Sequence, residues 1–296
     1  MKKFFGVMII CTFALAMQAQ TADEILDQYF ESIGGVEAWT SINSMTMEGT
    51  SSMQGMEFPL KVYSKRPNME KIEINAQGMQ IVQSFDGETA WSINPFAGST
   101  EPAKSGAEET AEAAKRTFED DFINYQDKGH TVELLGKEEI EGTETFKIKL
   151  TKKTGDEEIY FFDTENYVPI MMRSFAAMGP MKGQSVETFL SDYEEHDGLM
   201  IPMSMEQKVG GQTMMQGTMT SVVLNGDIPD EVFAFPAAEQ QTDDEEKMEE
   251  AKPAEIKEEM KEQLKGVEKQ AMEEGTEKTK GKMKEKGKKK KKSSGN

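Results

Sequence analysis

The stretch that decides the fold is residues 44–93, SMTMEGTSSMQGMEFPLKVYSKRPNMEKIEINAQGMQIVQSFDGETAWSI. Apolar and polar side chains alternate in it, or apolar ones form short runs, and this period of two is typical of β-strands. Gly55, Pro67-Asn68, Gln77-Gly78 and Asp86-Gly87 divide the stretch, and such short connections join antiparallel neighbours. The predicted strands are Ser44 to Ser52, Glu57 to Lys65, Glu70 to Ala76, Met79 to Phe85 and Thr89 to Ile93.

A helix is expected before this stretch. Thr21 or Asp23 can cap it, and Gly34-Gly35 can end it. Its apolar residues recur at helical spacing, at Ile25, Leu26, Tyr29, Phe30 and Ile33. The domain therefore opens with one amphipathic helix.

The pattern is interrupted after the fifth predicted strand. Residues Pro95 to Gly106 are rich in Gly, Ser, Pro and Ala, and Glu108 to Tyr125 carries apolar residues near one helical face. Strand patterns then resume to the end of the domain. They cover Thr131 to Leu135, Glu144 to Thr151, Glu157 to Asp163, Val168 to Phe175, Ser185 to Tyr193, Leu199 to Val209 and Gln212 to Leu224.

About a dozen strands and two helices follow from these patterns. An antiparallel sheet of that size has to curl to cover its apolar face, because two helices cannot cover all of it. We therefore predict an α+β fold that is mainly β: an incomplete antiparallel β-barrel covered by two helices, with a cavity inside and a charged C-terminal tail.

The first twenty residues have the three parts of a secretory signal peptide: Met1-Lys2-Lys3, an apolar run from Phe4 to Leu15, and small or polar residues up to Gln20. The apolar run is too short to cross a bilayer of about 30 Å as a helix. Cys11 lies in this run, and Ile10 before it is not the small residue that a lipidation site requires. We expect a periplasmic protein that is cleaved, not lipidated, and free of thiols.

A change in composition after Pro236 divides the mature chain into a domain, 21–236, and a tail, 237–296. The tail has no aromatic residue from Gln240 onward and ends in the lysine run Lys288 to Lys292. One hypothesis is a solvated, partly helical or disordered extension, because this composition cannot build a core. The other is that the lysine run binds an anionic envelope surface. The net charge of -20 argues against a nucleic-acid role.

The order of these pieces resembles the bacterial outer membrane lipoprotein-sorting proteins, the LolA/LolB-like periplasmic carriers. The resemblance covers nearly the whole domain and none of the tail. It lies in the opening helix Ala22 to Gly35, Lys65-Arg66-Pro67, the run Phe85 to Trp91, the helix Glu108 to Tyr125, the run Leu135 to Gly142, Tyr160 to Asp163, Leu190 to Tyr193, Asp197 to Pro202 and Asn225 to Phe233.

The resemblance implies an incomplete β-barrel, closed by helices, whose apolar interior accepts the acyl chains of lipoproteins. It also implies an arginine that latches the helical lid, for which Arg66 and Arg173 are candidates. The fold alone does not determine the cargo.

Methionine is the residue type that suits such a cavity, because its unbranched thioether adapts to irregular apolar shapes. Plain core filling is an equal alternative. The candidate ligand-binding residues are Met45, Met47, Phe58, Leu60, Ile72, Ile74, Phe85, Trp91, Met171, Met203 and Met205.

Two other functions remain open. Soft thioethers select Cu(I), and Met45, Met47, Met53, Met56, Met203 and Met205 have spacings that permit paired ligands, so a copper metallochaperone is one alternative. The other is a structural or sensor module that acts through protein contacts and the charged tail.

The sequence lacks the usual parts of an enzyme site. His130 and His196 are expected in exposed turns, and Ser185 precedes a strand and lacks the second glycine of a nucleophile elbow. A metal in the turn Glu194-Glu195-His196-Asp197 would match no helical zinc motif. We therefore expect a monomeric, non-enzymatic protein with no cofactor.

Overall fold

A computed structural model describes residues 20–53, 55–179 and 181–236 of the chain. The expectations for the signal peptide, Cys11, the tail and Lys288 to Lys292 fall outside these residues. Within the described part, no helix is long and apolar enough to cross a membrane.

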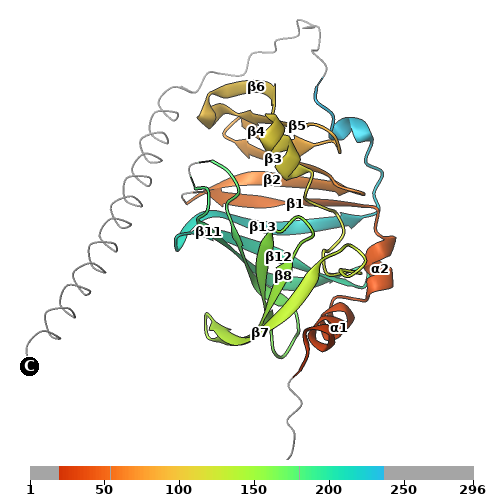
Figure 1. The fold of residues 1–296 in the computed structure, drawn as a ribbon. Helices are drawn as coiled ribbons and strands as arrows, with labels where there is room; N and C mark the ends of the chain where they lie inside the picture. Colours follow the sequence, from red (N-terminus) through yellow and green to blue (C-terminus); the bar gives the residue numbers. More distant parts are fainter. Residues whose placement is uncertain (1–19, 54, 180, 237–296) are drawn as a thin grey trace, which may run out of the picture.

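One antiparallel sheet of thirteen strands dominates the described part (Figure 1). The strands are β1 Ser44–Met53, β2 Met56–Lys65, β3 Met69–Ala76, β4 Met79–Phe85, β5 Ala90–Asn94, β6 Ser99–Lys104, β7 Thr131–Ile140, β8 Thr143–Thr151, β9 Glu157–Asp163, β10 Pro169–Phe175, β11 Ser185–His196, β12 Leu199–Val209 and β13 Gln212–Leu224.

The sheet order is β6-β5-β4-β3-β2-β1-β13-β12-β11-β10-β9-β8-β7, so the sheet is open at β6 and β7. Its two hairpin series join where β1 pairs with β13, for example Met47 with Val222. In Figure 1 the strands β7 and β8 cross in front of β12, as expected for a sheet that curls. The predicted fold class, an incomplete antiparallel barrel that is mainly β, is confirmed.

The register separates two faces of the sheet, because successive side chains of a strand point to opposite sides. One face, which we call the helix face, carries Met47 on β1, Leu60 on β2, Ile74 on β3 and Met205 on β12. It continues through the other strands as far as Ile148 on β8. The opposite face is more polar over β1 to β3, where Glu48 and Lys61 form an ion pair.

Helix α1, Ala22–Ser32, packs on the helix face over β8 and β9. Thr21 caps it in a capping box with Glu24, as expected of one of the two predicted caps. Its residues Ile25 and Leu26 are 0% and 2% exposed and pack in one core cluster with Ile148 and Phe162. This burial fixes α1 to the sheet.

The turn after α1 requires glycine. Gly34 has φ +103, and a Cβ there would lie 2.2 Å from the carbonyl oxygen of Gly198 in the β11–β12 turn. A second short helix, α2 Val36–Ser41, follows and was not predicted. Trp39 of α2 donates its indole N–H to the Ile33 carbonyl at 2.9 Å and thereby braces the end of α1.

The predicted second long helix, Glu108 to Tyr125, is wrong over most of its length. Only α3, Ala107–Ala113, is helical, and the chain then runs in turns up to β7. Polar side chains satisfy the backbone there in place of helical bonds: Thr117 Oγ1 donates to the Glu119 carbonyl, and Asp120 Oδ1 accepts from the Phe122 N–H.

Two further differences concern the strands. The break Pro95 to Gly106 contains a 3-10 turn, η1 Pro95–Ala97, and the edge strand β6, which was not predicted. The strand predicted to stop at Leu135 runs on to Ile140 through an irregularity between Leu134 and Lys137. A second 3-10 turn, η2 Asp230–Val232, lies in the segment that follows β13.

Candidate functional site: the helix face and its lid

The candidate site lies on the helix face, between the sheet and residues 107–130, which we call the lid segment. Its floor is rich in methionine over the adjacent strands β1, β13 and β12. The register places these side chains on the helix face: Met45, Met47, Met203, Met205, Met215 and Met219, which we call the methionine floor.

All but two of the predicted ligand-binding residues lie on the helix face. Met45, Met47 and Met203 belong to one cluster, and Phe58, Leu60, Ile72 and Ile74 belong to another on β2 and β3. Met205 and Phe85 also point to this face by register.

The two exceptions are Met171 and Trp91, which point to the opposite face by register. Met171 is 1% exposed and packs with Ile140 and Phe161. Trp91 donates its indole N–H to the Phe233 carbonyl at 2.7 Å. The structure therefore separates these two from the other candidates.

Phe118 is the lid residue that reaches the floor. Its ring packs against the cluster of Ile42, Leu199, Ile201 and Met203, which Met45, Met47 and Met219 also contact. Its backbone N–H donates to the Pro67 carbonyl at 3.1 Å. Sequence reasoning placed Phe118 on a helix, so it did not identify the residue as a cover for the methionines.

Arg66 holds the lid segment to α2. Its guanidinium donates to the carbonyls of Trp39 and Ile42 at the end of α2, at 3.1 and 2.6 Å, and to Glu119 Oε1 at 3.0 Å. It also lies 5.1 Å over the ring of Phe118. Arg173 instead pairs with Glu187 on the opposite face, and its guanidinium lies over Phe161. Of the two candidate arginines, only Arg66 contacts the lid.

Charged groups surround the attachment of the lid. Glu119 also forms an ion pair with Lys128 at 3.0 Å, and Asp121 forms one with Lys152 at 2.8 Å. Burial would raise the pKa of Glu119, but the hydrogen bonds from Lys128 and Arg66 outweigh burial and lower it. Burial raises the pKa of Asp120, whose carboxylate accepts a hydrogen bond from the hydroxyl of Tyr29 on α1.

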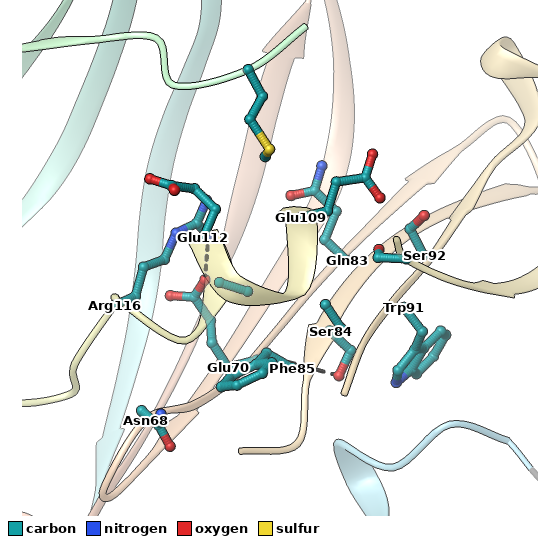
Figure 2. A pocket seen from close by; sticks show the side chains of 14 residues that line it. Asn68, Glu70, Gln83, Ser84, Phe85, Trp91, Ser92, Glu109, Glu112 and Arg116 are labelled. Atoms are coloured by element: carbon teal, nitrogen blue, oxygen red, sulfur yellow. Dashed lines mark hydrogen bonds and ion pairs between the residues drawn. The ribbon is translucent and has the colours of Figure 1, made fainter. Parts of the chain in front are cut away.

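Helix α3 roofs a pocket of about 310 Å³ over β3 to β5. Figure 2 shows Glu109 and Glu112 on α3 above Glu70 and Gln83 of the sheet, with the ion pair of Arg116 and Glu70 at 3.0 Å. Phe85 and Met178 also line this pocket. The side chains at the opening of the pocket are polar, and the sheet forms its floor.

The histidines are less exposed than expected. The side chain of His130 is 12% exposed, and its Nδ1 accepts the Lys153 N–H at 3.1 Å. The side chain of His196, at the end of β11, is 25% exposed. Ser185 opens β11, and its hydroxyl is buried without a hydrogen-bond partner. Among the described residues, no three His, Cys, Asp or Glu side chains gather as a metal site would require.

Fold and site together define a class: an open antiparallel half-barrel with an apolar inner face, one helix packed in the core and a lid segment that Arg66 fastens at Glu119. No protein-family model matches the chain, and no curated protein matches its sequence.

Several solved structures are similar to this chain in backbone fold. A DUF1329 family protein from Desulfovibrio piger is 14% identical, over 73% of this chain and 98% of that one, with a TM-score of 0.49. A LolA superfamily protein from Nitrosomonas europaea is 15% identical, over 73% and 98%, with a TM-score of 0.46. An outer membrane lipoprotein-sorting protein domain from Vibrio parahaemolyticus is 9% identical, over 71% and 94%, with a TM-score of 0.47.

Proposed function

We propose that this protein is a periplasmic, non-enzymatic carrier that holds an apolar ligand, an acyl chain of a lipid or lipoprotein, on the helix face of its half-barrel. The observation that carries the proposal is the cover of the methionine floor. Two aromatic side chains, Trp39 of α2 and Phe118 of the lid segment, pack against the cluster that contains Met203. The part of the lid segment from α3 to Glu119 is attached mainly by polar contacts, whereas Phe122 is buried in the core cluster under α1.

An acyl chain would replace Phe118 on the floor. Burial contributes about 0.8 kcal/mol per methylene, so a few covered methylenes offset the loss of one partly buried ring. Methionine side chains adapt to a flexible chain at small cost, because they are unbranched. In this proposal the structure is the closed state of the carrier.

The part of the lid segment from α3 to Glu119 can move without unfolding the domain, because Phe122 keeps the rest of the segment in the core cluster under α1. Helix α3 has no buried residue, and ion pairs join α3 and the turn after it to the rest of the chain: Glu108–Lys182 from α3, and Lys115–Asp156 and Arg116–Glu70 from the turn. Exposed ion pairs of this kind contribute about 0–1 kcal/mol each. The core cluster under α1 stays intact when they break.

Binding of a fluorescent fatty acid by the mature protein tests the proposal, alongside native mass spectrometry of the protein purified from its own envelope fraction. Met47→Gln should weaken probe binding, because the amide places a polar group on the floor. Met69→Gln is the matched control, since Met69 is also partly buried but points to the opposite face.

The comparison requires that both variants fold as the wild type does, and thermal melts measure this. A protein that arrives free of lipid and takes up no probe would contradict the carrier function and favour the structural or sensor module. Equal loss of binding in both variants would place the ligand elsewhere.

A further inference from the structure

Methionine and the other apolar residues are distributed unevenly over the helix face. Under the fixed helix α1, the buried residues are Ile, Leu, Phe, Tyr and Val, such as Ile148 and Leu150. The adjacent strands β1, β13 and β12 carry the methionine floor, of which Met45, Met47, Met203 and Met219 pack in the cluster that Phe118 of the lid segment covers. Bulk alone does not explain this difference, because Leu fills space as well as Met does.

The floor methionines are also accessible to a small molecule. Met203 is buried, whereas Met45, Met47, Met205, Met215 and Met219 are each partly exposed. On the opposite face Met171 is 1% exposed. A thioether that is partly exposed and not held in a rigid core is open to two-electron oxidants.

We propose that the methionine floor is an oxidation site, and that its conversion to methionine sulfoxide by a peroxide switches off binding of the apolar ligand. This inference rests on the proposed carrier function. The sulfur lone pair attacks one peroxide oxygen, the O–O bond breaks, an S–O bond forms and water leaves after proton transfer. The thioether loses two electrons, and hydrogen peroxide is reduced.

The consequence for the floor follows from polarity. A sulfoxide is a strong hydrogen-bond acceptor, and the cluster around Met203 surrounds the floor methionines with aliphatic side chains, Phe118 and Trp39, whose indole N–H is already donated to the Ile33 carbonyl. An acyl chain lying on it would desolvate that oxygen without a partner, which disfavours the bound state. The change is reversible, since sulfoxide reductases restore the thioether.

The test uses the mature full-length chain, hydrogen peroxide and a fluorescent fatty acid. Peptide mass mapping measures the rate of sulfoxide formation at each methionine, and probe titration measures affinity before and after oxidation. A variant with Leu at Met45, Met47, Met205, Met215 and Met219 keeps the apolar bulk but not the sulfur, and Met69→Leu with Met171→Leu is the control pair.

The five partly exposed floor methionines should oxidise before Met171, and the oxidised wild type should lose about tenfold or more in probe affinity. The floor variant is compared only with itself: whatever its affinity before peroxide, that affinity should not change after peroxide. The control pair should lose affinity as the wild type does, and sulfoxide reductases should restore it. Oxidised wild type that binds as before, or a floor variant that loses affinity equally, would overturn the inference while leaving the carrier function intact. Absence of probe binding in the reduced protein would reject both.

Discussion

At the scale of single residues, two arginines have similar surroundings, but only one of them fastens the lid segment. The side chains of Arg66 and Arg173 are 24% and 25% exposed, and their guanidinium groups lie 5.1 and 5.0 Å over a phenylalanine ring. They differ in what they join. Arg66 connects α2 to the lid segment, whereas Arg173 joins its own strand β10 to Glu187 on β11.

Arg66→Met should therefore release the lid. Loss of its hydrogen bonds should cost about 1.5–3 kcal/mol of lid attachment, because bonds to charged groups are the stronger ones. We expect faster proteolysis within residues 107–130 and an association rate for a fatty-acid probe that rises about tenfold. Arg173→Met is the control, and an equal effect of both substitutions would contradict a latch at Arg66.

Glu119 makes the attachment of the lid depend on pH. Its pKa is lowered from an ordinary value of 4.5, so its contribution to stability is present above that value and is lost as the pH falls through its folded pKa. Asp120 has the opposite sign: its pKa is raised, and its contribution falls as the pH rises through the folded value.

Trp39 lies beside the lid, so its fluorescence can follow this transition in a Trp91→Phe background. We expect the lid to loosen on acidification below pH 4.5 in the wild type and to be already loosened in Glu119→Gln at neutral pH. The difference between the pH profiles of the wild type and of Glu119→Gln gives the contribution of Glu119, because Asp120 is present in both proteins. Superimposable profiles would show that Glu119 does not hold the lid.

At the scale of elements, α1 and α3 cover the same face but are attached differently. Ile25 of α1 is 0% exposed, whereas α3 has no buried residue. We predict that backbone amides of α3 exchange hydrogen much faster than those of α1, and faster still in about 0.5 M salt, which screens exposed ion pairs. Mass-detected hydrogen exchange measures both, and equal protection of α3 and α1 would refute a separately moving lid.

The elements also show what a sequence can and cannot predict here. Most strands were predicted within a residue or two, since burial of one face imposes a period of two on segments such as Leu199–Val209. The lid was misread as helix, because the apolar spacing of Phe118 and Phe122 fits a helix equally well. The bonds of Thr117 and Asp120, which satisfy the backbone in the turns after α3, depend on the folded chain.

At the scale of the whole molecule, the pairing of β1 with β13 unites two hairpin series that lie far apart in the sequence. No local sequence pattern in Ser44–Met53 predicts that partner. The same holds for the candidate site: residue type identified the apolar candidates on the helix face, but only the register shows that Met171 and Trp91 point the other way.

The segment after β13 is hydrogen-bonded to side chains on the opposite face of the sheet. Lys65 Nζ donates to the Ile228 carbonyl at 2.7 Å, and Ser84 and Trp91 both donate to the Phe233 carbonyl. Phe233 is 0% exposed, so Phe233→Ala should lower the free energy of unfolding by about 3–5 kcal/mol. Phe235→Ala, at a partly exposed ring, should cost clearly less, and urea denaturation compares the two.

The account's central claim is that an acyl chain binds on the helix face, and the two tryptophans test it directly. Trp39 packs against the cluster that contains Met203, whereas Trp91 points to the opposite face. A brominated fatty acid quenches tryptophan at short range, and its unbrominated parent is the control. We predict quenching of Trp39 in the Trp91→Phe variant and none of Trp91 in the Trp39→Phe variant. Quenching of Trp91 alone, or of neither, would contradict the claim.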